Sequence, residues 1–470
     1  MSEPCLSAGS PPRNLIRVPN RIKLCAIAKN EGAYLADWVF HHLHFGFDAV
    51  EIWINGTDDT SVDIMQAIGA VYEQVSYKVA DKLLQKSLAQ RKYFQYLAYA
   101  RMAERALRQG FSHVGFLDLD EYWVPRDFAT GIHSFVPEDD QVNVVSFPWW
   151  VDTPDRNREP FEAVIHDSVA IQPDPHVKSV IRVDDRITQI RTHTARTSSG
   201  DRLLVDVPFP LVDDREQQWG SFVPREYLHE RRDSLPAAFV MHAIHRSETE
   251  YVASLAKGLR QVGADLRFKP NRGGYVPSDA PRLKFSPGLP QLRSYRQARS
   301  HFHDELGVGS LIRESERQTV ERADALVAMA AADASVMTEL RSQLHGVSSD
   351  ILDHRYPGWD SPIVWWVDAV EVVEGRIWVT GWAFNVDGAD VEFAVRDGSG
   401  EEWLNLPCES VPRPDVALVH PGAPLDCGFR IEVPAGVKGS LGEAVLMARV
   451  RGGYFWDVRS FSNLVTSAQG

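Results

Sequence analysis

Three carboxylate side chains follow a short apolar run in the N-terminal third of the chain, and they are the residues best suited to chemistry. Residues 114–117 read Val-Gly-Phe-Leu, and Asp118, Asp120 and Glu121 come directly after them. An apolar run of this length is typical of a buried parallel strand, and ligands bind at the carboxyl ends of such strands in open α/β sheets. Two aspartates at positions i and i+2 there direct oxygen ligands into one crevice, which suits Mg²⁺ or Mn²⁺. An acidic turn without a ligand is the alternative that this cluster alone leaves open.

The chain before this cluster alternates between strand-like and helix-like runs. Short apolar runs predict strands over residues 22–28, 49–54 and 75–79, and amphipathic spacing predicts helices over residues 31–45, 61–68 and 82–109. We expect Ser61 to cap the second of these helices. Such alternation specifies an α/β fold of Rossmann-like type with a mostly parallel sheet, and it brings the acidic cluster to the carboxyl edge of that sheet.

The rest of the chain divides by composition. Strands and long loops follow the cluster, residues 236–262 are helical in character, and residues 286–350 are rich in Ala, Arg, Glu and Leu at helical spacing. Short strand-like runs separated by Gly and Pro then predict a β-sandwich. We therefore expect a flexible tail over residues 1–20, an α/β domain over 21–280, a helical appendage over 281–355 and a β-sandwich module over 362–470.

Composition narrows the class of protein. The chain has 470 residues and a formal net charge of -14, which argues against a nucleic-acid binder. No stretch approaches the roughly 20 apolar residues of a membrane span, and the first residues lack the features of a signal peptide. The four cysteines are scattered without metal-site spacing. We expect a cytoplasmic protein, either free or peripheral to the inner face of the membrane.

Taken in this order, residues 22–262 resemble glycosyltransferases of the GT-A fold, in particular the family 2-like and family 92-like group. The stretches that carry the resemblance are 26–31 followed by Leu35 and Trp38, the polar turn 55–60, Gln95 with Ala98 and Tyr99, the Asp-x-Asp-Glu run within 116–121, and His242 with Ser247 and Tyr251. Ala243 departs from the pattern, because the group has a Tyr after the His. The resemblance covers about half of the chain.

The resemblance implies a metal-dependent, hexosyltransferase-type enzyme of glycan or polysaccharide biosynthesis. It would move a sugar from a nucleotide-diphosphate donor, UDP-type above all, to a glycan or lipid-linked acceptor. Asp118 and Asp120 are the expected metal ligands, and the resemblance adds His242, whose imidazole favours Mn²⁺ over Mg²⁺. A core histidine with no ligand is the alternative for His242.

Further polar residues at the same edge are expected to hold the donor. The predicted donor contacts are Lys29, Asn30, Glu31, Asn55, Asp58, Gln95, Asp118, Lys178 and Arg182. Lys178 and Arg182 resemble the group's Lys-Ser-x-x-Arg element, and a solvated basic strand is the alternative there.

An inverting transfer, which we expect, needs a carboxylate that takes the proton of the acceptor hydroxyl. Asp152 and Glu121 are the catalytic candidates, and Asp155 is a rival. The sequence itself does not separate inversion from retention.

The C-terminal module resembles small β-sandwich modules appended to bacterial glycosyltransferases. Its tryptophans belong either to a core or to a glycan-stacking surface, and the module is a candidate for homo-oligomer contacts or protein docking. Two other functional classes stay open. One is a nucleotidyltransferase-type nucleotide-sugar enzyme, although residues 29–32 supply a single glycine where such enzymes have a Gly-rich loop. The other is a non-catalytic carbohydrate-binding scaffold.

Overall fold

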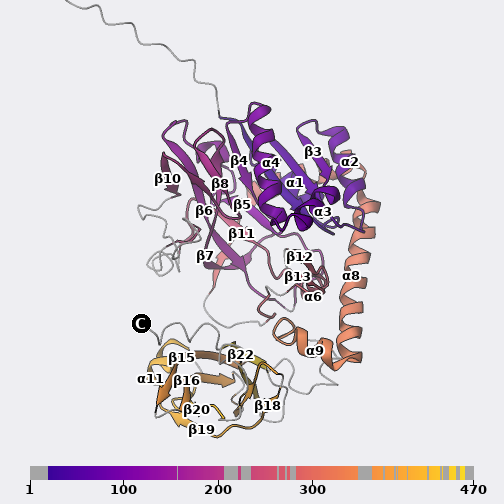
Figure 1. The fold of residues 1–470 in the computed structure, drawn as a ribbon. Coiled ribbons are helices and arrows are strands. Elements are labelled where there is room, and N and C mark those ends of the chain that lie inside the picture. Colours follow the sequence, from indigo (N-terminus) through magenta and orange to yellow (C-terminus); the bar gives the residue numbers. More distant parts are fainter. Residues whose placement is uncertain are drawn as a thin grey trace, which may run out of the picture.

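The computed structural model shows an N-terminal α/β part, a group of helices and a smaller C-terminal part of antiparallel sheets (Figure 1). The structure describes residues 20–155, 157–205, 221–223, 234–261, 264–269, 272–275, 282–347, 363–373, 376–385, 388, 390–399, 401–420, 423–434, 437, 444–450 and 456–460. Nearly all of the predicted N-terminal tail lies outside these residues.

The first half of the chain builds a mixed sheet. Its N-terminal strands are β1 (Ile22–Ala28), β2 (Ala49–Ile54), β3 (Val75–Val79) and β4 (His113–Phe116). They lie parallel in the order β3-β2-β1-β4, which is the order of the first half of a doubly wound sheet. The strands β1, β2 and β4 are almost entirely buried, as their continuous apolar runs require.

The second part of the sheet mixes strand directions. Its members are β5 (Glu121–Pro125), β6 (Val142–Asp152), β7 (Val169–Arg182), β10 (Asp201–Leu204), β11 (Ala238–His242) and β14 (Leu283–Phe285). Strand β7 runs antiparallel to both β4 and β6, so β6 points the same way as β4. Because β11 is parallel to β6, the carboxyl ends of β1, β2, β4, β6 and β11 all meet at one edge. Two small hairpins lie outside this sheet, β8 (Ile187–Ile190) with β9 (Ala195–Thr197) and β12 (Leu259–Gln261) with β13 (Ala264–Leu266).

The helices between these strands are α1 (Leu35–His44), α2 (Ser61–Val71), α3 (Asp81–Ala89) and α4 (Phe94–Arg108). The prediction of one helix over 82–109 is wrong. Arg91 adopts a left-handed φ of 52°, and Tyr93 is extended, so the chain breaks between α3 and α4. Ser61 is not the cap of α2 either. Thr60 is the residue before that helix, and the Ser61 hydroxyl accepts a hydrogen bond from the Glu31 amide at 3.2 Å.

The helical prediction for residues 236–262 is wrong for most of its length. Residues 238–242 form the central strand β11, whose side chains are all buried, and the helix α6 occupies only Glu248–Leu255. Ser247 caps α6, and its side chain and that of Glu250 form a reciprocal capping box.

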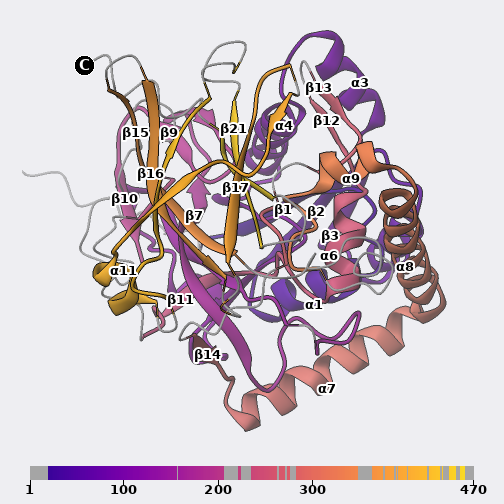
Figure 2. The same cartoon turned by 90° about the horizontal axis from the view of Figure 1, so that it is seen from below.

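Three further helices follow, α7 (Leu289–Leu306), α8 (Gly309–Ala332) and α9 (Ala334–Leu340), as the periodicity of this region predicts. Figure 2 shows α7 along one side of the sheet, near α1. Its residues Leu292, Tyr295 and Phe302 join the core under the sheet. In Figure 1, α8 runs down the side of the N-terminal half toward α9 and the C-terminal sheets.

The C-terminal half consists of two antiparallel sheets and a short helix, α11 (Pro414–Val419). One sheet contains β15 (Ile363–Val373), β16 (Arg376–Asn385), β20 (Gly428–Glu432) and β19 (Cys408–Val411), and the other contains β18 (Glu402–Trp403), β17 (Val391–Arg396), β21 (Val445–Val450) and β22 (Trp456–Ser460). Buried residues of both sheets, such as Ile431 and Leu446, share one apolar cluster with Leu326 of α8 and Met337 of α9.

No helix in the described ranges is long and apolar enough to cross a membrane. Cys25, Cys408 and Cys427 are free thiols.

Candidate metal centre and the adjoining pocket

The acidic cluster lies in the tight connection between β4 and β5, at the edge where the parallel strands end. The Glu121 amide donates to the Asp118 carbonyl at 3.0 Å, which closes the turn. Trp38, buried on α1, donates its indole N–H to the carbonyl oxygens of Asp118 at 3.1 Å and of Glu121 at 2.8 Å. The buried Trp38 therefore fixes the backbone of the turn, and this restricts the movement of the carboxylates attached to it.

Strand β11 brings His242 beside this turn. His242 is the register partner of Glu121, and the Ala243 amide donates to the Asp120 carbonyl at 2.7 Å. Asp120, Glu121 and His242 each offer a ligand atom, and these atoms all lie within 4.8 Å of one another. The Nε2 atom of His242 is 3.5 Å from Oδ2 of Asp120.

Two polar atoms of this group are buried and have no hydrogen-bond partner in the described part of the chain, namely Oε1 of Glu121 and Nδ1 of His242. Buried polar atoms are normally paired, so their orphaned state calls for an explanation. Two carboxylates and an imidazole form a donor set that fits a divalent metal ion such as Mn²⁺. Of the predicted ligands, Asp120 and His242 thus lie together, and Glu121 joins them.

Asp118 faces another partner. Its Oδ2 lies 3.2 Å from Nζ of Lys178, and the Tyr99 hydroxyl donates to its Oδ1 at 3.5 Å. The same ammonium group lies 3.1 Å from Oε2 of Glu121, and Lys178 is 1% exposed, so one buried cation serves two carboxylates. Gln95, which was predicted to contact the nucleotide sugar, donates a hydrogen bond to the Tyr99 hydroxyl at 3.0 Å and so extends this network.

The charges of the centre shift one another's pKa values. Burial opposes the charged form of Lys178, but Asp118 and Glu121 outweigh it and raise the pKa of Lys178. Burial, together with the neighbouring Asp118 and Asp120, raises the pKa of Glu121 well above its usual range. Burial would raise the pKa of Asp120 too, yet His242 holds that pKa well below its usual range. Asp118, Asp120 and Glu121 are therefore crowded together, and the raised pKa of Glu121 reflects the cost of charging all three carboxyl groups. A bound metal cation would lower that cost.

The residues after β1 and β2 that were predicted to contact the nucleotide-sugar donor connect the two loops that follow these strands. The Asn30 amide donates to the Thr57 hydroxyl at 2.9 Å, and the Asn30 side-chain oxygen accepts from the Asp58 amide at 2.9 Å. Asn30 has a left-handed φ of 54°. Lys29 donates to the Lys257 carbonyl, and the side-chain oxygen of Asn55 is buried with no partner among the described residues. These two loops lie beside the acidic turn and are held in place by their own hydrogen bonds.

Arg182 is not brought to this edge. It pairs in register with His113, at the opposite end of β4 from Asp118. Its guanidinium donates to the carbonyls of Val142 at 3.3 Å and Asp139 at 3.1 Å.

Asp152 lies at the carboxyl end of β6, buried. Its oxygens accept from the amides of His245 at 3.0 Å and Arg246 at 2.9 Å, and Arg158 lies 3.4 Å away. Burial opposes ionisation, but the His245 contacts lower the pKa of Asp152. These contacts favour a role in holding the segment after β11, and its action as a base stays a prediction. The rival Asp155 accepts from the Asn157 amide at 2.9 Å in an exposed turn.

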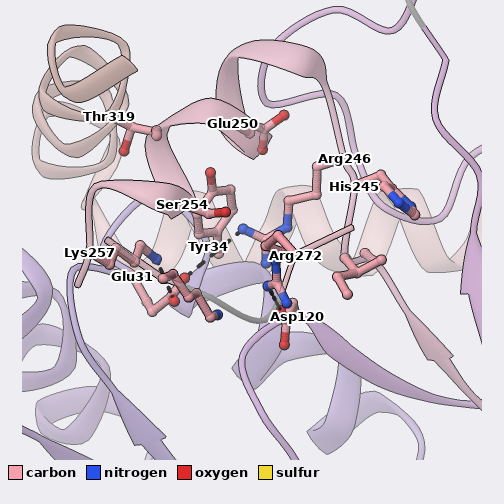
Figure 3. A pocket seen from close by; sticks show the side chains of 14 residues that line it. Glu31, Tyr34, Asp120, His245, Arg246, Glu250, Ser254, Lys257, Arg272 and Thr319 are labelled. Atoms are coloured by element: carbon pink, nitrogen blue, oxygen red, sulfur yellow. Dashed lines mark hydrogen bonds and ion pairs between the residues drawn. The ribbon is translucent and has the colours of Figure 1, made fainter. Parts of the chain in front are cut away.

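A pocket adjoins the acidic turn on the side of α6 and α8 (Figure 3). Its lining includes Asp120 of the acidic turn, Glu31 and Tyr34 from the segment just before α1, and Thr319 from α8. Four basic side chains also line it, namely Arg246, Lys257, Lys269 and Arg272. Of the pocket's charged side chains, only Glu31 and Asp120 are among the predicted site residues.

Sequence reasoning missed these four basic residues. Arg246 had one usable signal, because it directly precedes the Ser247 cap of α6 and follows the apolar strand that ends at His242. Lys269 and Arg272 had none, since they stand in irregular segments after β13.

Comparisons with models of known protein families and with curated proteins find no match to this chain.

Proposed function

We propose that the protein is a metal-dependent glycosyltransferase of the GT-A type, which moves a sugar from a nucleotide-diphosphate donor to a hydroxyl of a glycan or lipid-linked acceptor. The observation that carries the proposal is the group Asp120, Glu121 and His242 at the carboxyl edge of the sheet, with two of its buried polar atoms orphaned. Mn²⁺ is the favoured ion because the group includes an imidazole.

The chain's own residues have distinct tasks in such a reaction. Asp120, Glu121 and His242 would hold the ion, which acts as a Lewis acid on the leaving diphosphate. Asp118, held by Lys178 and Tyr99, presents its carboxylate toward the place of the donor's ribose. The braced loops that contain Asn30 and Asn55 form the wall for the nucleotide.

The finer architecture belongs to the same proposal. We take the two C-terminal sheets, whose buried side chains share one cluster, as the layers of a β-sandwich that carries acceptor or docking contacts. We further propose that the protein works in the cytoplasm, where nucleotide sugars serve as donors.

Metal binding and donor hydrolysis test the proposal together. Isothermal titration with Mn²⁺, and with UDP in the presence and absence of Mn²⁺, should show metal binding and metal-dependent UDP binding in the wild-type protein. His242→Gln should lose metal affinity, because a glutamine amide is a poor substitute for the imidazole ligand. Its melting temperature should fall only by the amount that the contact between Nε2 of His242 and Oδ2 of Asp120 contributes.

Asp120→Asn should lose both metal binding and turnover of a panel of nucleotide sugars. Arg293→Met, a change to an exposed residue of α7, is the matched control. Equal UDP affinity in EDTA and in Mn²⁺ would contradict the metal role. Formation of a nucleotidyl product in place of a free or transferred sugar would favour a nucleotidyltransferase.

A further inference from the structure

The pocket beside the acidic turn carries an excess of positive charge. Four basic side chains face three acidic ones there, and one of the acids, Glu250, is already used by the Ser247 amide and hydroxyl in the cap of α6. Glu31 pairs with Lys257 at 2.6 Å and lies 4.0 Å from Arg246. Asp120 is the remaining acid, and it belongs to the metal group. Two carboxylates thus serve four cations.

The burial of these cationic side chains also costs free energy in the folded protein. Arg246 and Arg272 are each 8% exposed, and the Nε atom of each has no hydrogen-bond partner in the described part of the chain. Burial, together with Arg272 and Lys257, lowers the pKa of Lys269 to about 8. Unpaired donors and crowded like charges in a buried site point to an absent anion, because buried charges are otherwise paired.

We propose that Lys257, Lys269 and Arg272 form a diphosphate-binding site, which receives the diphosphate of the donor beside the metal centre. The proposal rests on the glycosyl-transfer function for the identity of the ligand. Figure 3 shows Lys257 beside Glu31 and Arg272 beside Asp120 in the same pocket. Ammonium and guanidinium groups are the usual partners of phosphate oxygens in proteins.

Arg272 also occupies the oxygen that the metal ion needs. Its Nη2 lies 3.3 Å from Oδ2 of Asp120, and the same oxygen faces His242. A guanidinium and a divalent cation repel each other and compete for one carboxylate oxygen. The diphosphate resolves this competition, because it offers Arg272 a new partner and leaves Asp120 to the metal. Arg272 therefore exchanges its carboxylate partner for the phosphate when the donor binds.

Calorimetric titration with inorganic pyrophosphate in EDTA tests the site without metal or sugar. The wild-type protein should bind pyrophosphate more tightly than orthophosphate. Lys269→Met and Arg272→Met should each weaken pyrophosphate binding by at least about tenfold, the loss expected when one partner of a buried charge pair is truncated. Lys269→Arg keeps the charge and should retain most of the affinity, and Arg293→Met should retain all of it. Equal pyrophosphate affinity in all these proteins, each with a wild-type circular dichroism spectrum, would overturn the site.

A titration with Mn²⁺ alone tests the exchange of Arg272. Arg272→Met should bind Mn²⁺ more tightly than the wild-type protein, since the competing cation is gone, although the same variant binds pyrophosphate more weakly. A loss of affinity for both ligands would refute the exchange. The outcome is independent of turnover. A protein that binds pyrophosphate as described but transfers no sugar would contradict the proposed function and leave the anion site standing.

Discussion

Lys178 is the side chain on which the charge balance of the acidic turn depends. It is buried between Asp118 and Glu121 and is near the indole ring of Trp149, 5.7 Å from its centroid. Removal of its charge leaves the fully buried carboxyl of Glu121 and the partly exposed carboxylate of Asp118 without their ammonium partner. Loss of one partner of a buried ion pair is among the more destabilising changes that a protein interior can undergo.

We predict that Lys178→Met lowers the free energy of unfolding by about 3 kcal/mol in EDTA. Mn²⁺ should restore more stability to this variant than to the wild-type protein, because the metal cation replaces the lost charge. Urea unfolding with and without Mn²⁺ measures both effects. A variant as stable as the wild-type protein in EDTA would show that Glu121 and Asp118 are not held as charged groups.

At the scale of single residues, the acidic residues of the candidate metal centre were predicted from the sequence, and the basic residues of the adjoining pocket were not. Asp120 could be found because it follows a short apolar run, where the chain leaves a buried strand. His242 was predicted from the resemblance to the GT-A group, and it stands in a stretch that was predicted to be helical. Glu121 was predicted as a catalytic residue, and its place beside His242 emerges only from strand pairing. Arg272 is 152 positions from Asp120, and no local pattern reports a contact over that distance.

Among the elements, the contact between α1 and α7 holds a charged pair that makes stability depend on pH. Arg299 donates to both oxygens of Asp37 at 2.6 Å, and His303 lies 2.6 Å from Oδ1. Burial would raise the pKa of Asp37, but the hydrogen bonds from His303 and Arg299 outweigh it and lower that pKa from 3.8 to about 2. A lowered carboxyl pKa stabilises the fold above the unfolded-state pKa, and this stabilisation declines as the pH falls toward the folded-state value.

We predict that Asp37→Asn lowers the free energy of unfolding at pH 7 by roughly 2 kcal/mol. The difference between variant and wild type should be constant from neutral pH down to about pH 5 and should shrink below it, as the wild-type carboxylate of the unfolded state takes up its proton. Chemical unfolding at a series of pH values checks the sign. A difference that grows on acidification would contradict it.

Three strands could be predicted with their bounds, because β1, β2 and β3 begin and end at the predicted residues. Strands β1 and β2 are almost continuously buried, whereas β3 is largely exposed toward its end. The break between α3 and α4 was not, since the helical spacing of apolar residues continues across it. Strand β11 was missed because Ala-Phe-Val-Met-His has no alternation, and a short buried run of this kind looks alike in a helix and in a central strand.

At the scale of the whole molecule, we ask whether the N-terminal part of the chain folds without the C-terminal sheets. The site residues all come before residue 320, yet Leu326 and Met337 of the helices share their cluster with Ile431 and Leu446. Arg341 also donates to the Met447 sulfur at 3.3 Å.

We predict that a chain ending at residue 355 folds and binds Mn²⁺ and UDP, but melts several degrees lower than the full chain and self-associates through the uncovered faces of α8 and α9. Metal titration, thermal unfolding and light scattering test the three parts of this prediction. Slow hydrolysis of the donor should persist in it. If the shortened chain is insoluble or no longer binds nucleotide, the C-terminal sheets belong to the catalytic body.

The contacts of helix α8 restrict which changes in its own length the fold can accept. The Leu311 carbonyl of α8 accepts from Thr60 at 2.8 Å, Thr319 lines the pocket, and Leu326 reaches the cluster of the C-terminal sheets. Its 24 residues form a rod about 36 Å long. One residue inserted after Thr319 would rotate everything beyond it by about 100° around the helix axis, whereas seven residues, close to two full turns, would nearly preserve the facing side. Natural variants of this chain should therefore lengthen or shorten α8 in steps of about seven residues, and the distance from the pocket to the C-terminal sheets should change in discrete increments of roughly 10 Å.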